Sequence, residues 1–404
     1  MRLICKKPKT TDVLIYDRVG SEFILKSLSK GTDWGILDVR QIIFNIYPSV
    51  LLKFVLAIIQ RSAFEFDLNS SSGVHVTSNV SHAWFKKDSR LKRKRDRKPL
   101  SLRILSEYSL ISVIRPKVVV TFVDNSRRFN ILSRLYPKAK FIGVQNGFRG
   151  IEVADMSGYL CLTNFFCFGE ETKRRYESAG CQIGRFIIGG SLKDGLYREK
   201  AVTDTRMKYD FCWISQYKPQ RFEKGMTDLK NNSLRLLSFI EKYCGNEGKS
   251  LAIALACREK TFPYEYRFLL DVIQLEGVFL CPQDDSSYSS YKLIDQSRVA
   301  VTTCSTIGFE SIARGKKVLF CNFSNDKYYD IPSGYTDGIW SLRGADVRYT
   351  DFRERVSKIY DLSETEWRTS TQEMAQYFVQ TPISPLPQEI LKEEINRTLV
   401  AKPD

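Results

Sequence analysis

The chain has 404 residues, of which 43% are hydrophobic and 27% charged, with a formal net charge of +16. At roughly 100–200 residues per domain, this length predicts two or three domains, and the composition excludes wholesale disorder. The excess of positive charge indicates an anionic partner, which could be nucleic acid, an anionic membrane surface, or a substrate bearing phosphate or carboxylate.

The cysteines and histidines argue against a metal site. The ten cysteines show no CxxC spacing, and no signal peptide opens the chain, so we expect free thiols and a cytoplasmic protein. The two histidines, His75 and His82, have no third ligand beside them. With so few histidines, carboxylates are expected to carry any proton transfer or covalent chemistry, without a metal or other cofactor.

The first hundred residues predict two strands, two helices and a basic run. Strands are expected over 11–18 and 35–38, with a short helix over 21–29 between them. A long apolar helix is expected over 42–61, too interrupted by polar residues to span a membrane. The basic run 91–98 (LKRKRDRK) is either a solvated loop or a contact with anionic lipid headgroups.

Strands and helices then alternate up to about residue 190. Near-continuous β-branched runs in such an alternation favour a parallel sheet covered by helices on both faces. The expected strands are 117–122, 141–145, 165–168 and 186–188, and the expected helices are 102–114, 127–135 and 170–179.

The same alternation restarts after a polar stretch, 197–208, which predicts a linker. Strands are expected over 210–215, 251–256, 278–281, 299–303 and 318–320, and helices over 229–243, 264–274, 288–296 and 350–399, the last interrupted near 381–387. The sequence therefore predicts two doubly wound, Rossmann-like α/β domains that face a cleft and are closed by C-terminal helices. The expected boundaries are 1–200 for the acceptor-side domain, 201–349 for the nucleotide-sugar-binding domain and 350–404 for the closing helices.

The segment 301–320 (VTTCSTIGFESIARGKKVLF) predicts an anion site. It reads as a strand, a turn of small residues, a short helix ended by Gly315, and a second strand. Ser305 and Thr306 fall at the helix start, where hydroxyls and free N–H groups can hold a phosphate. Glu310, one turn further, could accept hydrogen bonds from ribose hydroxyls. The alternative is a plain N-cap with an acidic residue that complements the helix dipole.

The sequence lacks two common nucleotide-binding motifs, and four of its segments resemble those of a known enzyme family. There is no GxxxxGK[ST] and no GxGxxG after a first strand, which argues against a P-loop NTPase and a nicotinamide enzyme. The pattern STxGxExxxxGK over 305–316 resembles GT-B glycosyltransferases. Together with 144–148 (VQNGF), 189–194 (GGSLKD) and 213–217 (WISQY), it resembles the retaining β-Kdo transferase module of bacterial O-antigen synthases, related to the capsule β-Kdo transferases.

This resemblance implies a reaction and a nucleophile. The donor would be CMP-β-Kdo, the acceptor a non-reducing-end sugar of lipid-linked O-antigen, and the configuration would be retained by double displacement through a carboxylate. The resemblance places that carboxylate at Asn232, where an aspartate is expected, which suggests an engineered variant with slowed chemistry. The alternative is that Asn231 and Asn232 are polar residues at a helix start and that Asp228 or another acid is catalytic.

Polar side chains that follow the expected strands are the other candidate site residues. Asp124 is a candidate acid or base, or a helix cap. Arg258 and Lys260 are candidates for binding the donor phosphate or the Kdo carboxylate, or form a solvated loop. Lys193 and Asp194 could form an interdomain ion pair. The expected donor-binding residues are Ser215, Gln216, Arg258, Lys260, Ser305, Thr306 and Glu310, and the expected acceptor-binding residues are Gln145, Asn146 and Arg149.

Two alternatives remain at this stage. A GT-B enzyme could instead use CDP-glycerol or a UDP-sugar, which nucleotide selectivity would separate. A basic nucleic-acid-binding protein would show basic residues interleaved with aromatic residues, but here the charge is spread and the aromatic residues lie mostly in apolar runs. The preferred interpretation is a cytoplasmic transferase without a nucleic-acid partner. It could be peripheral on the inner face of the inner membrane, and part of a longer multidomain synthase.

Overall fold

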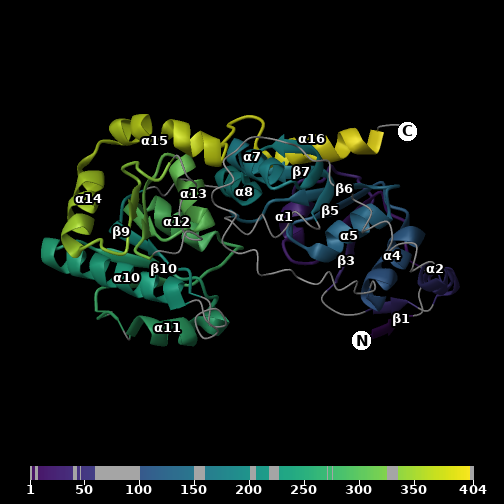
Figure 1. Cartoon of the computed structure of the whole chain (residues 1–404), viewed down its shortest axis with the longest axis horizontal. Helices are drawn as coiled ribbons and strands as arrows, with labels where there is room; N and C mark the ends of the chain where they lie inside the picture. The colour runs from purple at the N-terminus through teal and green to yellow at the C-terminus, as the bar shows by residue number, and fades with distance from the viewer. Residues whose placement is uncertain are drawn as a thin grey trace, which may run out of the picture.

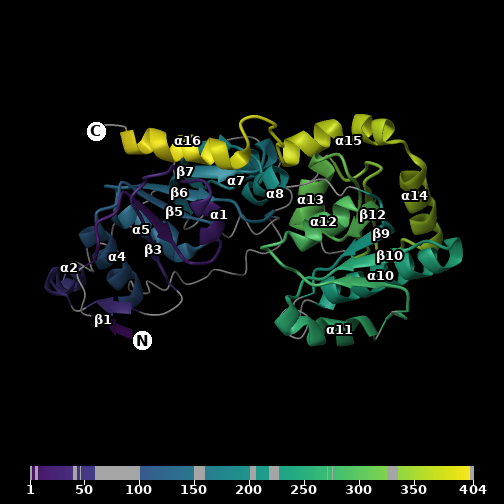
Figure 2. The ribbon, with the colours of Figure 1, turned by 180° about the vertical axis from the view of Figure 1, so that it is seen from behind.

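The structure is a computed structural model. It describes residues 2–4, 8–39, 43–45, 47–59, 101–149, 160–200, 206–217, 227–270, 272–274, 276–324 and 335–400. Within these residues the chain forms two α/β lobes side by side, with the helices of the C-terminus running along both (Figures 1 and 2).

The N-terminal domain is built on a six-stranded parallel sheet with the order β3-β2-β5-β6-β7-β8. A separate parallel pair, β1 with β4, precedes the long helix α2. The strands are β1 Arg2–Ile4, β2 Val13–Tyr16, β3 Trp34–Leu37, β4 Ile43–Asn45, β5 Val118–Thr121, β6 Lys140–Val144, β7 Cys161–Cys167 and β8 Gln182–Ile188. The helices are α1 Ser21–Leu25, α2 Pro48–Ile59, α4 Leu102–Ile114, α5 Arg127–Leu135, α7 Glu170–Ser178 and α8 Leu192–Lys200.

The C-terminal domain has a second six-stranded parallel sheet, ordered β11-β10-β9-β12-β13-β14, which is the strand order of dinucleotide-binding folds. Its strands are β9 Tyr209–Ile214, β10 Leu251–Ala254, β11 Phe279–Cys281, β12 Ser297–Thr302, β13 Lys317–Asn322 and β14 Ser341–Arg343. Its helical elements are α10 Thr227–Glu247, the 3₁₀ turn η1 Glu259–Thr261, α11 Phe262–Leu270, α12 Ser289–Asp295, α13 Thr306–Ala313 and α14 Tyr349–Asp361.

Two last helices carry the chain back from the second domain to the first. They are α15 Glu364–Phe378 and α16 Pro387–Val400, drawn in yellow across both lobes in Figures 1 and 2. On α16, Leu391 and Ile395 are buried in a core of the N-terminal domain. Glu394 accepts a hydrogen bond of 2.6 Å from Asn164 of β7 and forms an ion pair of 3.0 Å with Arg185 of β8. The C-terminus therefore holds the two domains together.

The cores follow from the strand sequences. In β2, Leu14 and Tyr16 belong to the core on one face of the sheet, whereas Val13 and Ile15 belong to the core on the other. A continuous apolar run suits this arrangement, because alternate side chains point to opposite faces and both are covered. A third core fills the C-terminal domain.

The sequence predicted the doubly wound architecture, and the structure confirms it. One helix begins later than expected, because Pro48 is the first residue of α2 and the residues before it form β4. Strands β7 and β8 begin earlier in the chain than expected. Several of their first residues are polar or only partly buried, so the pattern of apolar residues did not predict them. The expected linker 197–208 begins inside α8, and the basic run 91–98 and both histidines lie outside the described residues.

Helix α8 forms the polar contact between the domains. The hydroxyl of Ser191, just before α8, donates a hydrogen bond to Glu310 of α13. Asp194 forms an ion pair of 2.5 Å with Arg314 at the end of α13, and Tyr197 donates a hydrogen bond of 2.7 Å to Asp295 of α12. These groups are mostly buried, so the relative position of the domains depends on specific partners.

Candidate functional site

A cavity of about 720 Å³ lies between the carboxyl edges of the two sheets. The N-terminal sheet changes direction between β2 and β5, and the C-terminal sheet between β9 and β12. The loops after all four of these strands line the cavity. Crevices at such switch points are where open α/β sheets bind ligands, and here two of them face each other.

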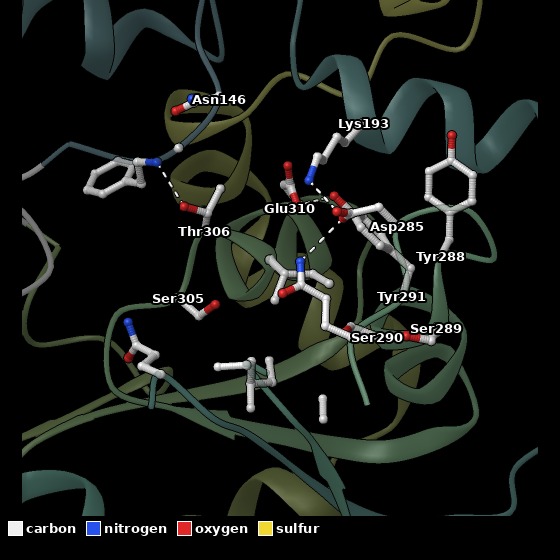
Figure 3. Close-up of a pocket in the computed structure, with 18 of the residues that line it drawn as sticks. Asn146, Lys193, Asp285, Tyr288, Ser289, Ser290, Tyr291, Ser305, Thr306 and Glu310 are labelled. Atoms are coloured by element: carbon white, nitrogen blue, oxygen red, sulfur yellow. Dashed lines mark hydrogen bonds and ion pairs between the residues drawn. The ribbon is translucent and has the colours of Figure 1, made fainter. Parts of the chain in front are cut away.

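The start of α13 forms one wall of the cavity. Ser305 is the N-cap residue, and among the described residues its hydroxyl caps no backbone N–H. The hydroxyl oxygen of Thr306 accepts a hydrogen bond of 2.9 Å from the backbone N–H of Phe148 in the other domain (Figure 3). The N–H of Gly308 already bonds the Ser305 carbonyl, so among the described residues the Thr306 hydroxyl hydrogen and the N–H groups of Thr306 and Ile307 remain available to an anion in the cavity.

A bridge of three charged side chains that line the cavity joins the two domains. Asp285, after β11, forms ion pairs with Lys193 of α8 at 3.0 Å and with Arg258, after β10, at 2.7 Å. The Lys193–Asp285 pair is drawn in Figure 3. Burial alone would raise the pKa of Asp285, but Lys193 and Arg258 outweigh it and lower that pKa. The bridge has two cations and one anion, so it keeps a net positive charge.

Glu310 lies deeper, at the cavity wall, with both carboxylate oxygens bonded. One oxygen accepts a hydrogen bond from Ser191, and the other accepts one of 2.6 Å from the hydroxyl of Tyr291. Burial and the nearby Asp194 raise the pKa of Glu310 to about 7, against the opposing effects of both hydroxyls and of Arg314. The proposed role of Glu310 in binding ribose hydroxyls is compatible with its place on the cavity wall.

The raised pKa of Glu310 predicts a pH-dependent stability. Because the folded pKa of about 7 exceeds the unfolded value near 4.5, this group stabilises the fold fully below pH 4.5. That contribution is lost as the pH rises through 7. Glu310→Gln should therefore reduce the fall in unfolding free energy between pH 5 and 8 by ~2 kcal/mol, at about 1.4 kcal/mol per pKa unit.

Urea unfolding at the two pH values measures this difference. Glu354→Gln, which removes an exposed glutamate of α14, serves as the control and should leave the pH dependence unchanged. An equal pH dependence in wild type and Glu310→Gln contradicts the prediction.

The expected acceptor-side residues divide into two kinds. Asn146 and Arg149 line the cavity, and the guanidinium of Arg149 is held by Asp124 at 2.5 Å and by Asn146 at 2.6 Å. Asp124 itself is fully buried beneath Arg149 and is not among the residues lining the cavity. Gln145 is also buried, and bonds the backbone of Phe168 and Gly147. Asp124 and Gln145 therefore shape the site without lining it.

Ser215 and Gln216 follow β9 and line the cavity as expected. Ser215 donates a hydrogen bond to the buried carboxylate of Glu265, which also accepts from the backbone N–H of Cys257 at 2.8 Å. Gln216 accepts a hydrogen bond of 2.9 Å from the backbone N–H of Cys304. These contacts fix the loops after three neighbouring strands of the C-terminal sheet, which form the cavity floor.

Asn232 does not reach the cavity in this structure, in contrast to the prediction that position 232 supplies the nucleophile. Its side chain is 2% exposed, and its amide donates hydrogen bonds to the hydroxyl of Thr303 at 2.8 Å and to the carbonyl of Cys321 at 3.1 Å. Its carbonyl oxygen accepts one of 2.5 Å from the backbone N–H of Phe323. The residue ties α10 to the ends of β12 and β13, so its geometry is that of a structural amide.

The sequence predicted two of the three residues of the charged bridge as candidates, but not Asp285. The sequence predicts Arg258 as a donor-binding residue and allows Lys193 and Asp194 an ion pair between the domains. In the structure Lys193 and Arg258 both pair with Asp285, and the pair of Lys193 with Asp285 joins the two domains. Asp194 instead bonds Arg314 and, at 2.9 Å, Arg198. No local pattern distinguishes Asp285 within its polar loop. Lys260 falls in the turn η1, and its side chain lies outside the described part of the chain.

Two facing Rossmann-like domains with the cavity between them define a GT-B-like protein, and comparisons with solved structures agree. UDP-GlcNAc 2-epimerase from Neisseria meningitidis, bound to UDP-GlcNAc, is similar at 14% identity over 99% of this chain and 100% of that chain, with a TM-score of 0.50. The epimerase from Methanocaldococcus jannaschii, in complex with UDP-GlcNAc and UDP, is similar at 13% identity over 99% of each chain, with a TM-score of 0.52. S. aureus MnaA with UDP is similar at 11% identity over 98% of this chain and 95% of that chain, with a TM-score of 0.52.

The family is shown by a match that covers more than half of the chain. Residues 142–380 match the model of the family described as "putative O-antigen biosynthesis protein", and the chain belongs to that family. No curated protein matches the chain. The matched residues include the loop 145–149, α8, and every cavity-lining residue of the C-terminal domain.

None of the helices that the structure describes combines the length and the apolar character needed to cross a bilayer.

Proposed function

We propose that the protein is a glycosyltransferase of O-antigen biosynthesis, which binds a nucleotide-activated sugar in the cavity between its domains. The observation that carries this proposal is the start of α13. Among the described residues the Ser305 hydroxyl caps no backbone N–H, and this helix start lines one cavity together with Arg149, Lys193 and Arg258. Several fixed positive groups in a concave site suit the phosphates of such a donor and can stabilise the charge that develops on the leaving nucleotide.

The family and the similar structures support this class of ligand. The family is one of O-antigen biosynthesis, and the epimerase structures from N. meningitidis and M. jannaschii hold UDP-GlcNAc. Because the α13 helix start belongs to the C-terminal domain, that domain would hold the nucleotide phosphates, and the N-terminal domain would face the acceptor.

The finer proposal is that the donor is CMP-β-Kdo and the acceptor is the non-reducing end of a lipid-linked O-antigen at the inner face of the inner membrane. It rests on the sequence resemblance and on the cations that line the cavity, which could pair with the Kdo carboxylate. Retention through residue 232 is not included, because that side chain lies outside the cavity. No metal is included, since cationic side chains and the α13 N-terminus can carry the leaving-group charge.

Calorimetric titration with CMP, UMP, AMP and GMP tests the proposal. A preference for CMP supports a CMP-sugar or CDP-linked donor, and incubation with CMP-Kdo or CDP-glycerol then separates the two. A preference for UMP favours a UDP-sugar donor and contradicts the assignment of CMP-Kdo as the donor. An absence of binding by all four nucleotides contradicts the proposed function itself.

A variant pair locates the binding site. Arg258→Ala should weaken the binding of the preferred nucleotide by about tenfold, because a charge-assisted contact with phosphate is lost. Arg267→Ala, which removes an exposed arginine of the nearby α11 that does not line the cavity, should change the affinity by less than about twofold. Equal effects of the two substitutions would indicate general electrostatic attraction instead of a site.

A further inference from the structure

The N-terminal half of the cavity contains one carboxylate among its described lining residues, that of Glu22. The other carboxylates of the lining, Asp284, Asp285 and Glu310, all come from the C-terminal domain. Transfer of a sugar to a hydroxyl group needs a base close to that hydroxyl. If the nucleotide occupies the C-terminal half, the acceptor meets the N-terminal half, where Glu22 is the available carboxylate.

The backbone turn before Glu22 directs this residue towards the N-terminal half of the cavity. Asp17 and Gly20 both adopt left-handed backbone conformations, with φ of 78° and 72°. A Cβ atom at Gly20 would lie 2.2 Å from the ring of Phe122, so only glycine allows the start of α1 to approach the end of β5 this closely. Left-handed conformations in non-glycine residues such as Asp17 concentrate at functional sites. The turn thus places Glu22 at the switch point of the sheet.

The surroundings of Glu22 suit a sugar, because aromatic rings line the cavity beside it. The next residue, Phe23, packs against Phe122 with ring centroids 5.1 Å apart, and both rings line the cavity. The ammonium of Lys193 lies 4.9 Å above the ring of Phe23. Glu22 is exposed, and with the residues that the structure describes its carboxylate forms neither a hydrogen bond nor an ion pair.

The other lining carboxylates are already engaged. Asp284 accepts hydrogen bonds from the backbone N–H and the hydroxyl of Ser286 at 2.9 and 2.7 Å. Asp285 forms the bridge with Lys193 and Arg258, and Glu310 is bonded through both oxygens. Glu22 alone among these described carboxylates can accept a proton without first breaking such a contact.

We infer that Glu22 is the general base that activates the acceptor hydroxyl, an assignment that rests on the proposed glycosyl transfer. The Glu22 carboxylate takes the hydroxyl proton while the acceptor oxygen forms a bond to the anomeric carbon. The bond between that carbon and the phosphate oxygen breaks, and its electron pair leaves with the nucleotide. The α13 N-terminus holds the resulting charge, and the proton later passes from Glu22 to water.

The test compares Glu22→Gln with Glu170→Gln. Glu170 is an exposed glutamate in the first turn of α7, at the same edge of the same sheet, but it does not line the cavity. The assay measures nucleotide release from CMP-Kdo, CDP-glycerol and UDP-GlcNAc, with water or with octyl glycosides of galactose and N-acetylglucosamine as acceptors. Calorimetry measures nucleotide affinity, and thermal unfolding measures stability.

The expected result is a fall in kcat of about 100-fold or more for Glu22→Gln, with nucleotide affinity within about twofold of wild type and an unchanged unfolding temperature. Glu170→Gln should match wild type throughout. The inference is overturned if Glu22→Gln releases nucleotide within about threefold of the wild-type rate, or if wild type binds nucleotide yet releases none from any donor. If wild type binds no nucleotide, the proposed function fails first and the base assignment fails with it.

Discussion

Asn232→Asp is expected to destabilise the protein by ~2–4 kcal/mol and to leave sugar transfer no faster. The amide of Asn232 donates to Thr303 and to the carbonyl of Cys321, and an aspartate can donate neither bond while ionised. A carboxylate at this 2% exposed position would face the Cys321 carbonyl without a cation among its bonded partners. Leaving a buried charged group unpaired costs several kcal/mol, so urea unfolding should show a large shift.

The neighbouring residue supplies the control. Asn231 is exposed on the same helix, and Asn231→Asp should change the unfolding free energy by less than about 0.5 kcal/mol. The prediction that residue 232 is the nucleophile implies the opposite outcome, since restoring an aspartate should then accelerate transfer strongly. A gain in transfer rate with little loss of stability would show that α10 rearranges to present this residue, and would restore the double-displacement mechanism.

Arg314→Met is expected to cost about 3–5 kcal/mol and to loosen the contact between the domains. The Arg314 guanidinium is 8% exposed and bonds Asp194 at 2.5 Å and Asp295 at 3.1 Å. Removing it takes the shared cation from two largely buried carboxylates and leaves Asp194 with Arg198 alone, which is the costly way to break a buried ion pair. Because Asp194 belongs to α8 and Arg314 follows α13, the loss should appear in urea unfolding and in faster proteolysis between the domains.

A surface ion pair gives the comparison. Arg353 of α14 lies 3.2 Å from Glu247, with the arginine side chain 60% exposed. Arg353→Met should cost at most about 1 kcal/mol, because water and salt screen the pair. Similar costs for Arg314→Met and Arg353→Met would contradict the view that the buried network fixes the domain arrangement.

The candidate site could be predicted from the sequence where it depends on the ends of strands. Ser215 and Gln216 lie at the end of one predicted strand, and Ser305 and Thr306 lie shortly after another. The carboxyl ends of parallel strands meet at one edge of a sheet, and all four residues line the cavity there. The sequence did not predict that Glu22 lines the cavity, although this residue also comes after a predicted strand. A single acidic residue in the first turn of a helix resembles an ordinary complement to the helix dipole.

The helices and strands and their order along the chain follow from local sequence patterns. The pattern of 301–320 predicted a strand, a turn, a helix ended at Gly315 and a second strand, and the structure contains β12, α13 and β13 at those places. Strand and helix periodicity, caps and glycine turns act over a few residues, so the local sequence carries them. The alternation of strands and helices was likewise sufficient to predict two parallel sheets.

The contacts between polar side chains, in contrast, depend on how the elements pack in three dimensions. Asn232 and Asp228 lie on the same helix, and the rotation of α10 against its sheet turns Asn232 into the core. Asp285, Lys193 and Arg258 come from three separate elements, and the approach of the two domains brings them together. Such pairings depend on packing between residues far apart in the chain, and no short sequence pattern predicts them. Charged side chains are usually exposed to solvent, so their local sequence does not show which of them will be paired.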